Sequence, residues 1–416
     1  MNVCFVNTTD LIGGAERCSF DLLRGLRDRD HRASLVVGRK LSGDSDVHPC
    51  HYPAWDWKPR AFLNYRAGLT DTTLLTPFRM IRRHEAFNSA QAVSIHNMHG
   101  SYWNFWTVPY IARLKPVVLT LHDEWLLTGD CAYTYDCDRW MRSCGNCPQM
   151  KWEHRPALGG RDATAVNVQL KRLATRAARR ERVTIVTPSE WLTSRARRSP
   201  HLSRFDAITI PNGIDLDTYS PQPRDKSKAR LGLPRFLFGF LFFANNISDP
   251  RKGAPLLDAM LARRGLPDRT LLHVVGNGAE ALAAKFPGLP IHAAGYLSDQ
   301  SAIAECLSAA DCLLLLSAAD NLPYTGIEAS ACGCPILARR VGGIPEIVAD
   351  GENGMLMDGN PSPDALFEAM SRMAGLAADR HSAMRATARD IAARRFGLSK
   401  FVDAYERLFL EVHART

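Results

Sequence analysis

Hydrophobic residues in this chain gather in short continuous runs, many of them rich in β-branched side chains. Continuous runs of this kind are typical of parallel strands that are buried on both faces of a sheet. They predict strands at residues 3–6, 34–37, 93–95, 117–121, 183–186 and 207–210, and in the second half at 237–243, 271–275, 291–293, 312–316, 336–338 and 355–357.

Segments of helical composition lie between many of these strands, for example at 16–27, 170–181, 255–264 and 302–309. Strands and helices that alternate throughout a chain indicate an α/β fold with parallel sheets. Because 416 residues exceed the usual size of one domain, we predict two Rossmann-like, doubly wound domains that face each other across a cleft. Ligands of such sheets bind beyond the carboxyl ends of the strands.

A polar, proline-containing segment at 217–235 interrupts the alternation, and we place the domain linker at its start. Residues 1–215 are predicted to form an N-terminal domain, and residues 216–395 are predicted to form a C-terminal domain. Residues 396–416 are expected to form a C-terminal helix that packs back on the first domain.

The composition, 46% hydrophobic and 23% charged, is typical of a globular protein with filled cores. The N-terminus lacks the basic and apolar regions of a signal peptide. The most apolar stretch, 236–244, is too short to cross a bilayer, which takes about 20 residues. We therefore expect a soluble, cytoplasmic protein. Its net charge of +9 favours an anionic partner: a phosphorylated ligand, a membrane surface or nucleic acid.

The segment 315–346 carries the densest set of candidate binding residues. A buried strand ends at Leu316, a polar loop follows, and a helix is predicted to begin near 323–325, where proline suits the first turn. The free amides of that turn are a natural phosphate site. Asp320 in the loop and Glu328 on the helix can each accept hydrogen bonds with two oxygens, one from sugar hydroxyls and the other from a ribose diol.

An Asp-x7-Glu spacing taken alone describes an ordinary pair of solvated acids. Here it follows a buried strand, and the helix that carries Glu328 ends in Cys332-Gly333-Cys334-Pro335, with glycine at the expected C-terminal position. With that Ala-Cys-Gly-x-Pro tail, the segment resembles the Glu-x7-Glu signature of glycosyltransferase family 4, in a variant form in which Asp320 stands where Glu is more common.

The resemblance extends over nearly the whole chain and is weakest at 39–92. It implies a GT-B fold and a retaining, nucleotide-sugar glycosyltransferase of the bacterial polysaccharide type (group 1). The donor site is then in the C-terminal half. It adds four further residues of the signature to the donor-binding set: Asn321, Leu322, Pro323 and Thr325.

Two other elements of the second half match the family in order. Arg251 and Lys252 precede a glycine just after the first strand of the second domain, and the family's Arg/Lys-Lys-Gly element grips the donor diphosphate. Such cations stabilise the charge that grows on the leaving group, because Arg holds two phosphate oxygens and Lys acts as a point charge. Gly276 and Asn277 resemble the family's glycine turn beside the nucleotide.

In the first domain, Gly13 and Gly14 follow the first strand and open a helix, so that backbone amides can come close to an anion. A plain tight turn is the alternative. The resemblance implies that this loop approaches the reacting sugar and phosphate, and we assign Glu16 to the acceptor side.

His122 and Asp123 directly follow the strand at 117–121, at the strand end that is expected to face the cleft. Members of the family commonly place a His there beside the transferred sugar. We expect His122 to hydrogen-bond the donor sugar or to help position the acceptor. Asp123 and, further along, Ser189 are assigned to the acceptor side.

The resemblance also implies a metal-independent reaction that keeps the anomeric configuration through an oxocarbenium-like transition state. Catalysis is assigned to His122, Arg251, Lys252 and Asp320, with a nucleotide-diphosphate sugar as donor and no catalytic cofactor. The expected acceptor is a glycan or a polyprenyl-diphosphate-linked sugar, in bacterial exopolysaccharide, capsule or lipopolysaccharide biosynthesis.

Four of the eleven cysteines form a cluster: Cys131, Cys137, Cys144 and Cys147. Four thiolates at such spacing can hold a tetrahedral Zn²⁺ ion. Two disulfides or unligated buried thiols are the alternatives, and a cytoplasmic location disfavours the disulfides. A structural zinc would stiffen the loop beside His122.

Basic residues outnumber acidic ones at 151–198, for instance at Lys171-Arg172 and 179–182. Four aromatic residues lie further back in the chain among Arg and Lys: Trp55, Trp57, Phe62 and Tyr65. A basic surface with exposed aromatics suits peripheral docking on an anionic membrane, here the inner face of the plasma membrane. A solvated helix face is the alternative for any one run.

Two other functions were weighed. A GT-B sugar-nucleotide 2-epimerase shares the fold and the diphosphate grip, but the Asp320/Glu328 motif disfavours it. A nucleic-acid-binding protein is suggested by the charge alone. No helix-turn-helix, zinc-finger or RNA-binding signature supports it, so we expect no nucleic-acid partner.

Overall fold

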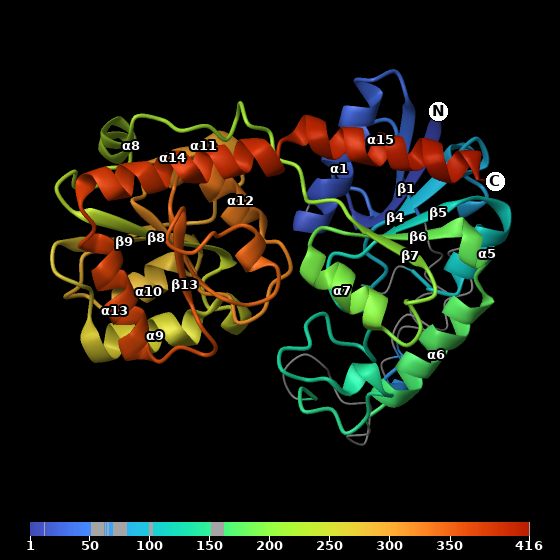
Figure 1. The fold of residues 1–416 in the computed structure, drawn as a ribbon, viewed down its shortest axis with the longest axis horizontal. Coiled ribbons are helices and arrows are strands. Elements are labelled where there is room, and N and C mark those ends of the chain that lie inside the picture. Colours follow the sequence, from blue (N-terminus) through green and yellow to red (C-terminus); the bar gives the residue numbers. More distant parts are fainter. Residues whose placement is uncertain are drawn as a thin grey trace. The chain divides into compact units, whose positions relative to one another are not determined.

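The computed structural model describes residues 1–11, 13–50, 62, 64, 66–69, 81–99, 103–150 and 162–415. The chain divides into two compact units (Figure 1). Unit 1 contains Met1–Gly213 and Ser399–Thr416, and unit 2 contains Ile214–Leu398. The division lies close to the boundaries expected from the sequence.

Unit 1 is built on a seven-stranded sheet with the order β3-β2-β1-β4-β5-β6-β7, in which every pair is parallel. The order reverses between β1 and β4. Loops that follow these two strands therefore lie at the switch point, where doubly wound sheets bind ligands. The strands are β1 (Asn2–Thr9), β2 (Arg32–Arg39), β3 (Val47–Pro49), β4 (Ala92–Ile95), β5 (Val117–Thr120), β6 (Val183–Thr187) and β7 (Asp206–Thr209).

The helices that accompany this sheet include the last one of the chain, α15. Its Val402 packs against Gly25, where an added Cβ would lie 2.4 Å from a Val402 methyl. Its Tyr405 hydroxyl is hydrogen-bonded to Thr120 Oγ1 at 3.0 Å, which ties the C-terminus to β5. The helices are α1 (Gly14–Arg27), α4 (Glu85–Asn88), α5 (Thr107–Leu114), α6 (Thr164–Ala177), α7 (Glu190–Arg198) and α15 (Leu398–Ala414), with short 3₁₀ turns η1 (Arg139–Met141) and η2 (Arg180–Arg182).

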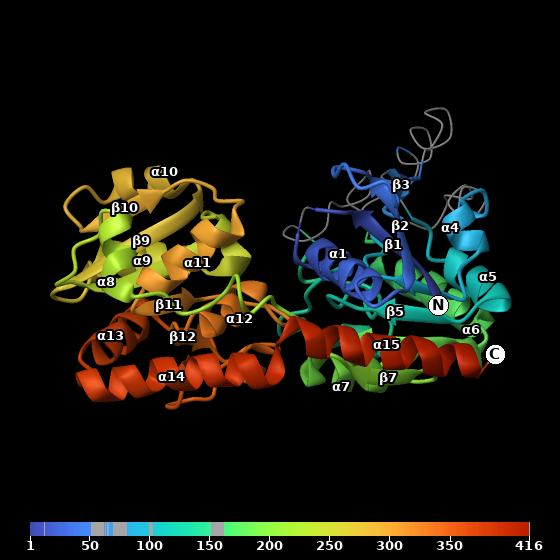
Figure 2. The same ribbon diagram turned by 90° about the horizontal axis from the view of Figure 1, so that it is seen from above.

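Unit 2 has a six-stranded sheet with the order β10-β9-β8-β11-β12-β13, again with all pairs parallel. Figure 2 labels β9, β10, β11 and β12 of this sheet. Here the order reverses between β8 and β11, so the loops after these strands lie at the switch point. The strands are β8 (Phe238–Asn246), β9 (Thr270–Asn277), β10 (Ile291–Ala294), β11 (Cys312–Leu315), β12 (Ile336–Arg339) and β13 (Gly354–Met357).

The helices of unit 2 run from α8 to α14: α8 (Arg224–Arg230), α9 (Ala254–Arg264), α10 (Ala279–Lys285), α11 (Gln300–Ala309), α12 (Tyr324–Ala331), α13 (Pro363–Ala374) and α14 (Ala378–Arg395), with η3 (Pro250–Lys252) and η4 (Ile344–Glu346).

The hydrophobic runs that form the strands are continuous in the sequence because successive residues face two different cores. In β11, Leu313 and Leu315 belong to one cluster of buried residues. Cys312 and Leu314 belong to the other, on the opposite face of the sheet.

Two doubly wound parallel α/β sheets confirm the predicted fold class, and each predicted strand is present within a few residues. The differences are local. The short β3 was not predicted, and α6 begins at Thr164 rather than near 170. The segment placed at the linker contains α8, whose Lys228 and Arg224 both reach Asp311, at 2.6 and 2.7 Å.

Candidate active site

The candidate donor site of unit 2 is built from the loops that follow β8 and β11. Helix α12 begins at Tyr324 with Pro323 at its N-cap, which confirms the predicted start of the helix. The loop before it carries Asp320, and Gly342 packs directly on that loop. An added Cβ on Gly342, where φ is +57°, would lie 1.7 Å from the Asp320 carbonyl oxygen. Only glycine permits this contact.

The two loops are joined by backbone contacts. The Ala318 amide donates to the Arg251 carbonyl at 2.7 Å. Asp249 caps the turn η3 by accepting a hydrogen bond from the Arg251 amide at 2.9 Å. Gly253 ends the turn with φ +93°, and an added Cβ there would lie 2.3 Å from the Leu316 carbonyl oxygen. The Arg-Lys-Gly element is therefore held at a fixed position beside the Asp320 loop.

The side chains of the two loops form a charged cluster. Lys252 Nζ lies 2.6 Å from Asp320 Oδ2, and Arg251 Nη1 lies 3.5 Å from the same oxygen. The Ser317 hydroxyl donates to that oxygen at 3.2 Å. Burial alone would raise the pKa of Asp320, but the charges of Lys252 and Arg251 outweigh it and hold this pKa below its usual value. The carboxylate is therefore ionised at neutral pH.

This cluster is suited to binding an anion. The Asp320 residue is 7% exposed, whereas the side chains of Lys252 and Arg251 are 26% and 25% exposed. Both cations can therefore be reached from solvent, while the buried carboxylate fixes their positions through its ion pairs. A phosphate group that approaches them would share Lys252 with Asp320 and form charge-assisted hydrogen bonds.

The other predicted donor-binding residues of the 315–346 segment lie on α12 and in the loop before it. Glu328 is buried on α12, next to the half-buried Thr325 on the same helix. Asn321, Leu322 and Pro323 are buried in the loop that leads to α12. Their predicted contacts with a nucleotide sugar remain predictions.

The glycine turn follows β9. An added Cβ on Gly276, where φ is +142°, would lie 1.8 Å from the Ala244 carbonyl oxygen, so the turn requires glycine. The Asn277 side-chain Nδ2 donates to the Asn245 backbone carbonyl at 2.9 Å, which joins the ends of β9 and β8. The turn is thus part of the same strand edge as the charged cluster.

In unit 1, the glycine loop follows β1 and leads into α1, as predicted. Gly13 is the N-cap residue and Gly14 is the first residue of the helix. At Gly13, φ is +107°, and an added Cβ would lie 2.4 Å from Glu16 Oε2. Glu16 is buried and accepts a hydrogen bond from Asn97 Nδ2 at 3.0 Å. Burial raises the pKa of Glu16 above its usual value.

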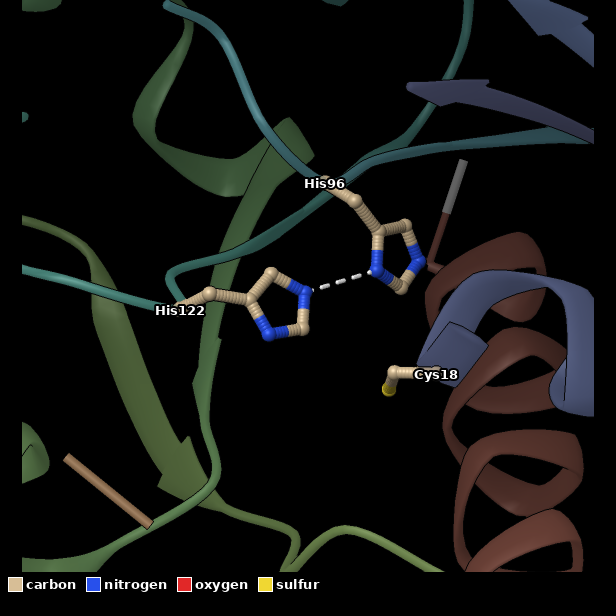
Figure 3. Close-up of side chains that lie close together, drawn as sticks. All are labelled: Cys18, His96 and His122. Carbon is tan, nitrogen blue, oxygen red and sulfur yellow. Dashed lines mark hydrogen bonds between the residues drawn. The ribbon is translucent and has the colours of Figure 1, made fainter. Parts of the chain in front are cut away.

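Two histidines meet at the ends of β4 and β5 (Figure 3). His96 Nδ1 and His122 Nε2 are hydrogen-bonded at 3.0 Å, and the His96 Nε2 lies 3.2 Å from the Ser94 hydroxyl. Burial lowers the pKa of His122 to about 4 and that of His96 well below its usual value. Both rings are therefore neutral at pH 7, and one donates while the other accepts.

Cys18 of α1 lies beside this pair (Figure 3). In the described part of the chain, Cys18, His96 and His122 are the one group of three potential metal ligands whose ligand atoms all lie within 4.8 Å of one another. The hydrogen bond between the rings accounts for their approach without an ion. His96 was not predicted, although its place directly after the strand 93–95 was a usable signal.

Asp123 contacts a third histidine, His99. Its Oδ2 lies 2.8 Å from His99 Nε2, and its Oδ1 accepts a hydrogen bond from the Trp125 amide at 2.8 Å. Burial alone would raise the pKa of Asp123, but His99 keeps it below its usual value. His99 is a second polar residue of this strand edge that the sequence did not single out.

Ser189 has a structural role in the described chain. It is the N-cap of α7, fully buried, and its hydroxyl accepts a hydrogen bond from the Leu192 amide at 3.1 Å. This contact is what a serine at an N-cap provides. Its predicted place on the acceptor side remains a prediction.

One member of the predicted basic surface is corrected by the structure. Lys171 is fully buried. Its ammonium group donates to the carbonyls of Trp125 and Thr128 at 2.5 and 3.0 Å, which compensates the loss of water. It lies 3.4 Å from the Trp125 ring centroid, so it forms part of the core rather than of a docking face. Phe62 is 56% exposed. Three of the aromatic residues lie outside the described residues: Trp55, Trp57 and Tyr65.

The described helices include none with the length and apolarity that a membrane span needs. Docking at the surface of an anionic membrane therefore remains a hypothesis.

Two doubly wound parallel sheets define the GT-B class of fold, and solved structures share it over the whole chain. Sucrose-phosphate synthase from Thermosynechococcus elongatus matches with a TM-score of 0.74 and 16% identity, and covers 100% of both chains. Anabaena Alr3699/HepE in complex with UDP-glucose matches with a TM-score of 0.68 and 18% identity, over 99% of this chain and 100% of its own.

Two family models match consecutive parts of the sequence. The model for Glycosyltransferase Family 4 matches residues 12–218, and the model for Glycosyl transferases group 1 matches residues 239–375. The chain belongs to the family 4, group 1 glycosyltransferases, which confirms the resemblance drawn from Asp320 and Glu328.

Curated relatives match a smaller part of the chain. The D-inositol 3-phosphate glycosyltransferase of Arthrobacter sp. (strain FB24) is 33% identical over 172 residues, which are 38% of this chain and 40% of that protein. The match thus spans about two fifths of that relative's length.

Proposed function

We propose that this protein transfers a glycosyl group from a nucleotide-diphosphate sugar to an acceptor hydroxyl, with retention of the anomeric configuration. The observation that carries the proposal is the cluster of Lys252, Arg251 and Asp320 at the switch point of unit 2. The leaving group of such a transfer is a nucleotide diphosphate, and fixed cations stabilise the charge that develops on it.

The contacts of the donor follow from this placement. Lys252 and Arg251 bind the diphosphate together with the first amides of α12. Glu328 accepts the hydroxyls of the ribose, and Asp320 accepts those of the sugar once the phosphate has drawn Lys252 away. Gly276 and Asn277 lie at the same strand edge and complete the nucleotide site. These steps require no metal ion.

Unit 1 is proposed to contribute His122 to the sugar. A neutral imidazole offers one donor and one acceptor nitrogen, which suits a hydroxyl-rich ligand. His96 Nδ1 lies 3.0 Å from His122 Nε2, so the hydrogen bond to His96 fixes the orientation of the ring that is proposed to contact the sugar. Because an imidazole with a pKa of about 4 is a weak base, we assign His122 to positioning of the sugar rather than to proton removal.

For the acceptor we propose a glycan or a polyprenyl-diphosphate-linked sugar, in bacterial exopolysaccharide, capsule or lipopolysaccharide biosynthesis. The names of the curated relatives add a phosphorylated cyclitol, D-inositol 3-phosphate, as a second candidate. The polyprenyl-diphosphate-linked sugar and the inositol phosphate both carry phosphate, which agrees with the net charge of +9. Transfer of labelled sugar to each acceptor separates them. A 2-epimerase would instead consume the donor without an acceptor and release an isomer.

The donor site is tested by calorimetric titration of UDP, GDP and ADP into the wild-type protein and Lys252→Ala. UDP comes first because Alr3699/HepE was solved with UDP-glucose. We expect one nucleotide to bind selectively and the variant to lose about 1.5–3 kcal/mol of binding free energy, roughly tenfold or more in affinity.

Lys285→Ala is the matched control, because Lys285 forms an ion pair with Asp258 at 2.5 Å in the same unit and is not among the residues assigned to the donor site. It is expected to leave the affinity unchanged. If no nucleotide binds, or if both lysine variants behave alike, the assignment of the charged cluster to the diphosphate is wrong.

A further inference from the structure

We propose that Cys131, Cys137, Cys144 and Cys147 bind a structural Zn²⁺ ion in unit 1. The proposal is independent of the donor site, which lies in unit 2. It rests on the spacing of the four cysteines in the sequence and on their surroundings in the structure.

The four thiols line one small cavity. Its volume is about 20 Å³, and its other walls include Thr134, Trp140 and Thr164. A space of this size holds a single small guest, since about 10–15 Å³ is enough for one water molecule. None of the four cysteines forms a disulfide. Four soft ligands around one small cavity are the donor set that zinc prefers.

The last two cysteines are presented by a tight turn. Cys144, Gly145 and Asn146 have φ values of +54°, +85° and +46°, so three successive residues lie in the left-handed region. Such a backbone is rare outside glycine. Arg139 Nη1 stabilises it by donating to the carbonyls of Gly145 and Asn146, at 3.0 and 2.6 Å. The turn brings the thiols of Cys144 and Cys147 to the same cavity.

Individual contacts in the surroundings would favour bound thiolates. The Gly129 amide donates a hydrogen bond to Cys144 Sγ at 3.3 Å. Binding of Zn²⁺ by four thiols releases four protons and leaves a complex with a net charge of −2. Lys171 interacts electrostatically with Cys144, and Arg139 with Cys147, so two cations offset this charge.

The cavity is wider than a closed zinc site. Among the described residues, no three of these thiols lie within 4.8 Å of one another, whereas a Zn–S distance of about 2.3 Å brings the sulfur atoms closer than that. We therefore infer that the ion draws the four side chains inward and contracts the cavity. Trp140, which is buried in the cavity wall, would report this contraction.

The ion would fix the segment that follows β5. The Cys147 amide donates to Asp162 Oδ2 at 2.8 Å, and the Gly145 amide donates to Thr164 Oγ1 at 3.0 Å, so the turn is tied to the start of α6. At the other end, the Thr134 amide donates to Glu124 Oε2 at 2.8 Å. Glu124 stands two residues after His122, and the ion thereby supports the position of that histidine.

The test is the metal content of the full-length protein purified without chelator, measured by inductively coupled plasma mass spectrometry. We expect about one zinc ion per chain. Cys144→Ser should lose the ion, whereas Cys306→Ala, which changes a buried cysteine of unit 2, should keep it. Removal of zinc from the wild-type protein should change tryptophan fluorescence, and this change should be absent in Trp140→Phe.

The wild-type protein alone also decides the question if Cys144→Ser fails to fold. Four thiols should be protected from alkylation until the zinc is removed. A protein free of zinc whose four thiols react at once would overturn the proposal, as would a peptide map that shows disulfides within 131–147. Zinc that stays bound in Cys144→Ser would also overturn it.

Discussion

The charged cluster of unit 2 follows β8 and β11, at the switch point of its sheet, and the histidine pair of unit 1 follows β4 and β5, next to the switch point of its own sheet. Burial has opposite consequences in the two places. Asp320 is buried and stays ionised, because Lys252 and Arg251 supply the opposite charge. His122 faces a second imidazole at 3.0 Å, and the charge of Asp123 raises the pKa of His122 by less than burial lowers it, so the ring is neutral. The partner that a buried group meets thus decides its ionisation.

This difference matches the two parts of a nucleotide-sugar donor. A diphosphate carries charge, and the proposed site for it keeps fixed charges in unit 2. A sugar carries hydroxyl groups, and the proposed contact in unit 1 is a neutral ring with one donor and one acceptor nitrogen. A charged His122 would have only donors, so it would lose the ability to accept a hydrogen bond from a hydroxyl.

The largest effect is expected from removal of the buried carboxylate. Asp320→Ala removes the carboxylate that pairs with Lys252 and one of the two that lie near Arg251, which also lies 3.6 Å from Asp249, and both cationic side chains are about a quarter exposed, so that solvent screens them. We expect a loss of about 1–3 kcal/mol in the free energy of unfolding, below the usual cost of breaking a fully buried pair. Differential scanning calorimetry measures it as a lowered Tm.

The matched control for this variant is Asp258→Ala, because Asp258 forms an exposed pair with Lys285. It should change stability by less than about 0.5 kcal/mol. The two variants of the charged pair should also differ in their nucleotide affinity. Lys252→Ala weakens nucleotide binding, whereas Asp320→Ala frees the lysine for the phosphate and should not weaken it. Equal losses in both would show that Asp320 itself binds the nucleotide.

Much of the fold follows from local sequence, because a strand buried on both faces leaves a continuous hydrophobic run wherever it occurs. Helix α8 was missed for the opposite reason. It lacks an apolar stripe, and Lys228 and Arg224 hold it through Asp311, which lies far along the chain. The short strand β3 has too few residues to form a recognisable run.

The candidate site shows the same limit. Asp320, Lys252 and His122 could be found because each belongs to a motif that is contiguous in the sequence. Their partners could not, because the pairing depends on which strands are neighbours. His96 reaches His122 because β4 and β5 are adjacent in the sheet. His99 lies beside Asp123, and no motif in the sequence predicts that contact.

A smaller effect is expected from the histidine pair. His96→Leu removes a hydrogen bond between neutral groups, which is worth about 0.5–1.5 kcal/mol of stability. The loss should appear in thermal unfolding and should be smaller than that of Asp320→Ala. The control is His413→Leu, at an exposed position of α15, with a change within about 0.5 kcal/mol. A larger loss for His96→Leu than for Asp320→Ala would reverse the comparison between the two regions.

A further prediction concerns the pH dependence, and it separates the two regions by their pH windows. The pKa of His122 falls from 6.5 to about 4 on folding, so the unfolded chain takes up the proton first. The contribution of His122 is therefore complete above pH 6.5 and is lost as the pH falls towards 4. The pKa of Asp320 is lowered from 3.8, so its contribution is lost only below that value.

Nuclear magnetic resonance of ¹⁵N-labelled imidazoles should show a neutral His122 ring at pH 5, and the stability of His122→Gln should vary less between pH 6.5 and 4 than that of the wild-type protein. Other buried histidines, such as His201 and His273, titrate in the same window, so the difference between the two proteins is the relevant quantity. A His122 ring that is protonated at pH 6 would show that the charge of Asp123 outweighs burial, and the contrast with Asp320 would then disappear.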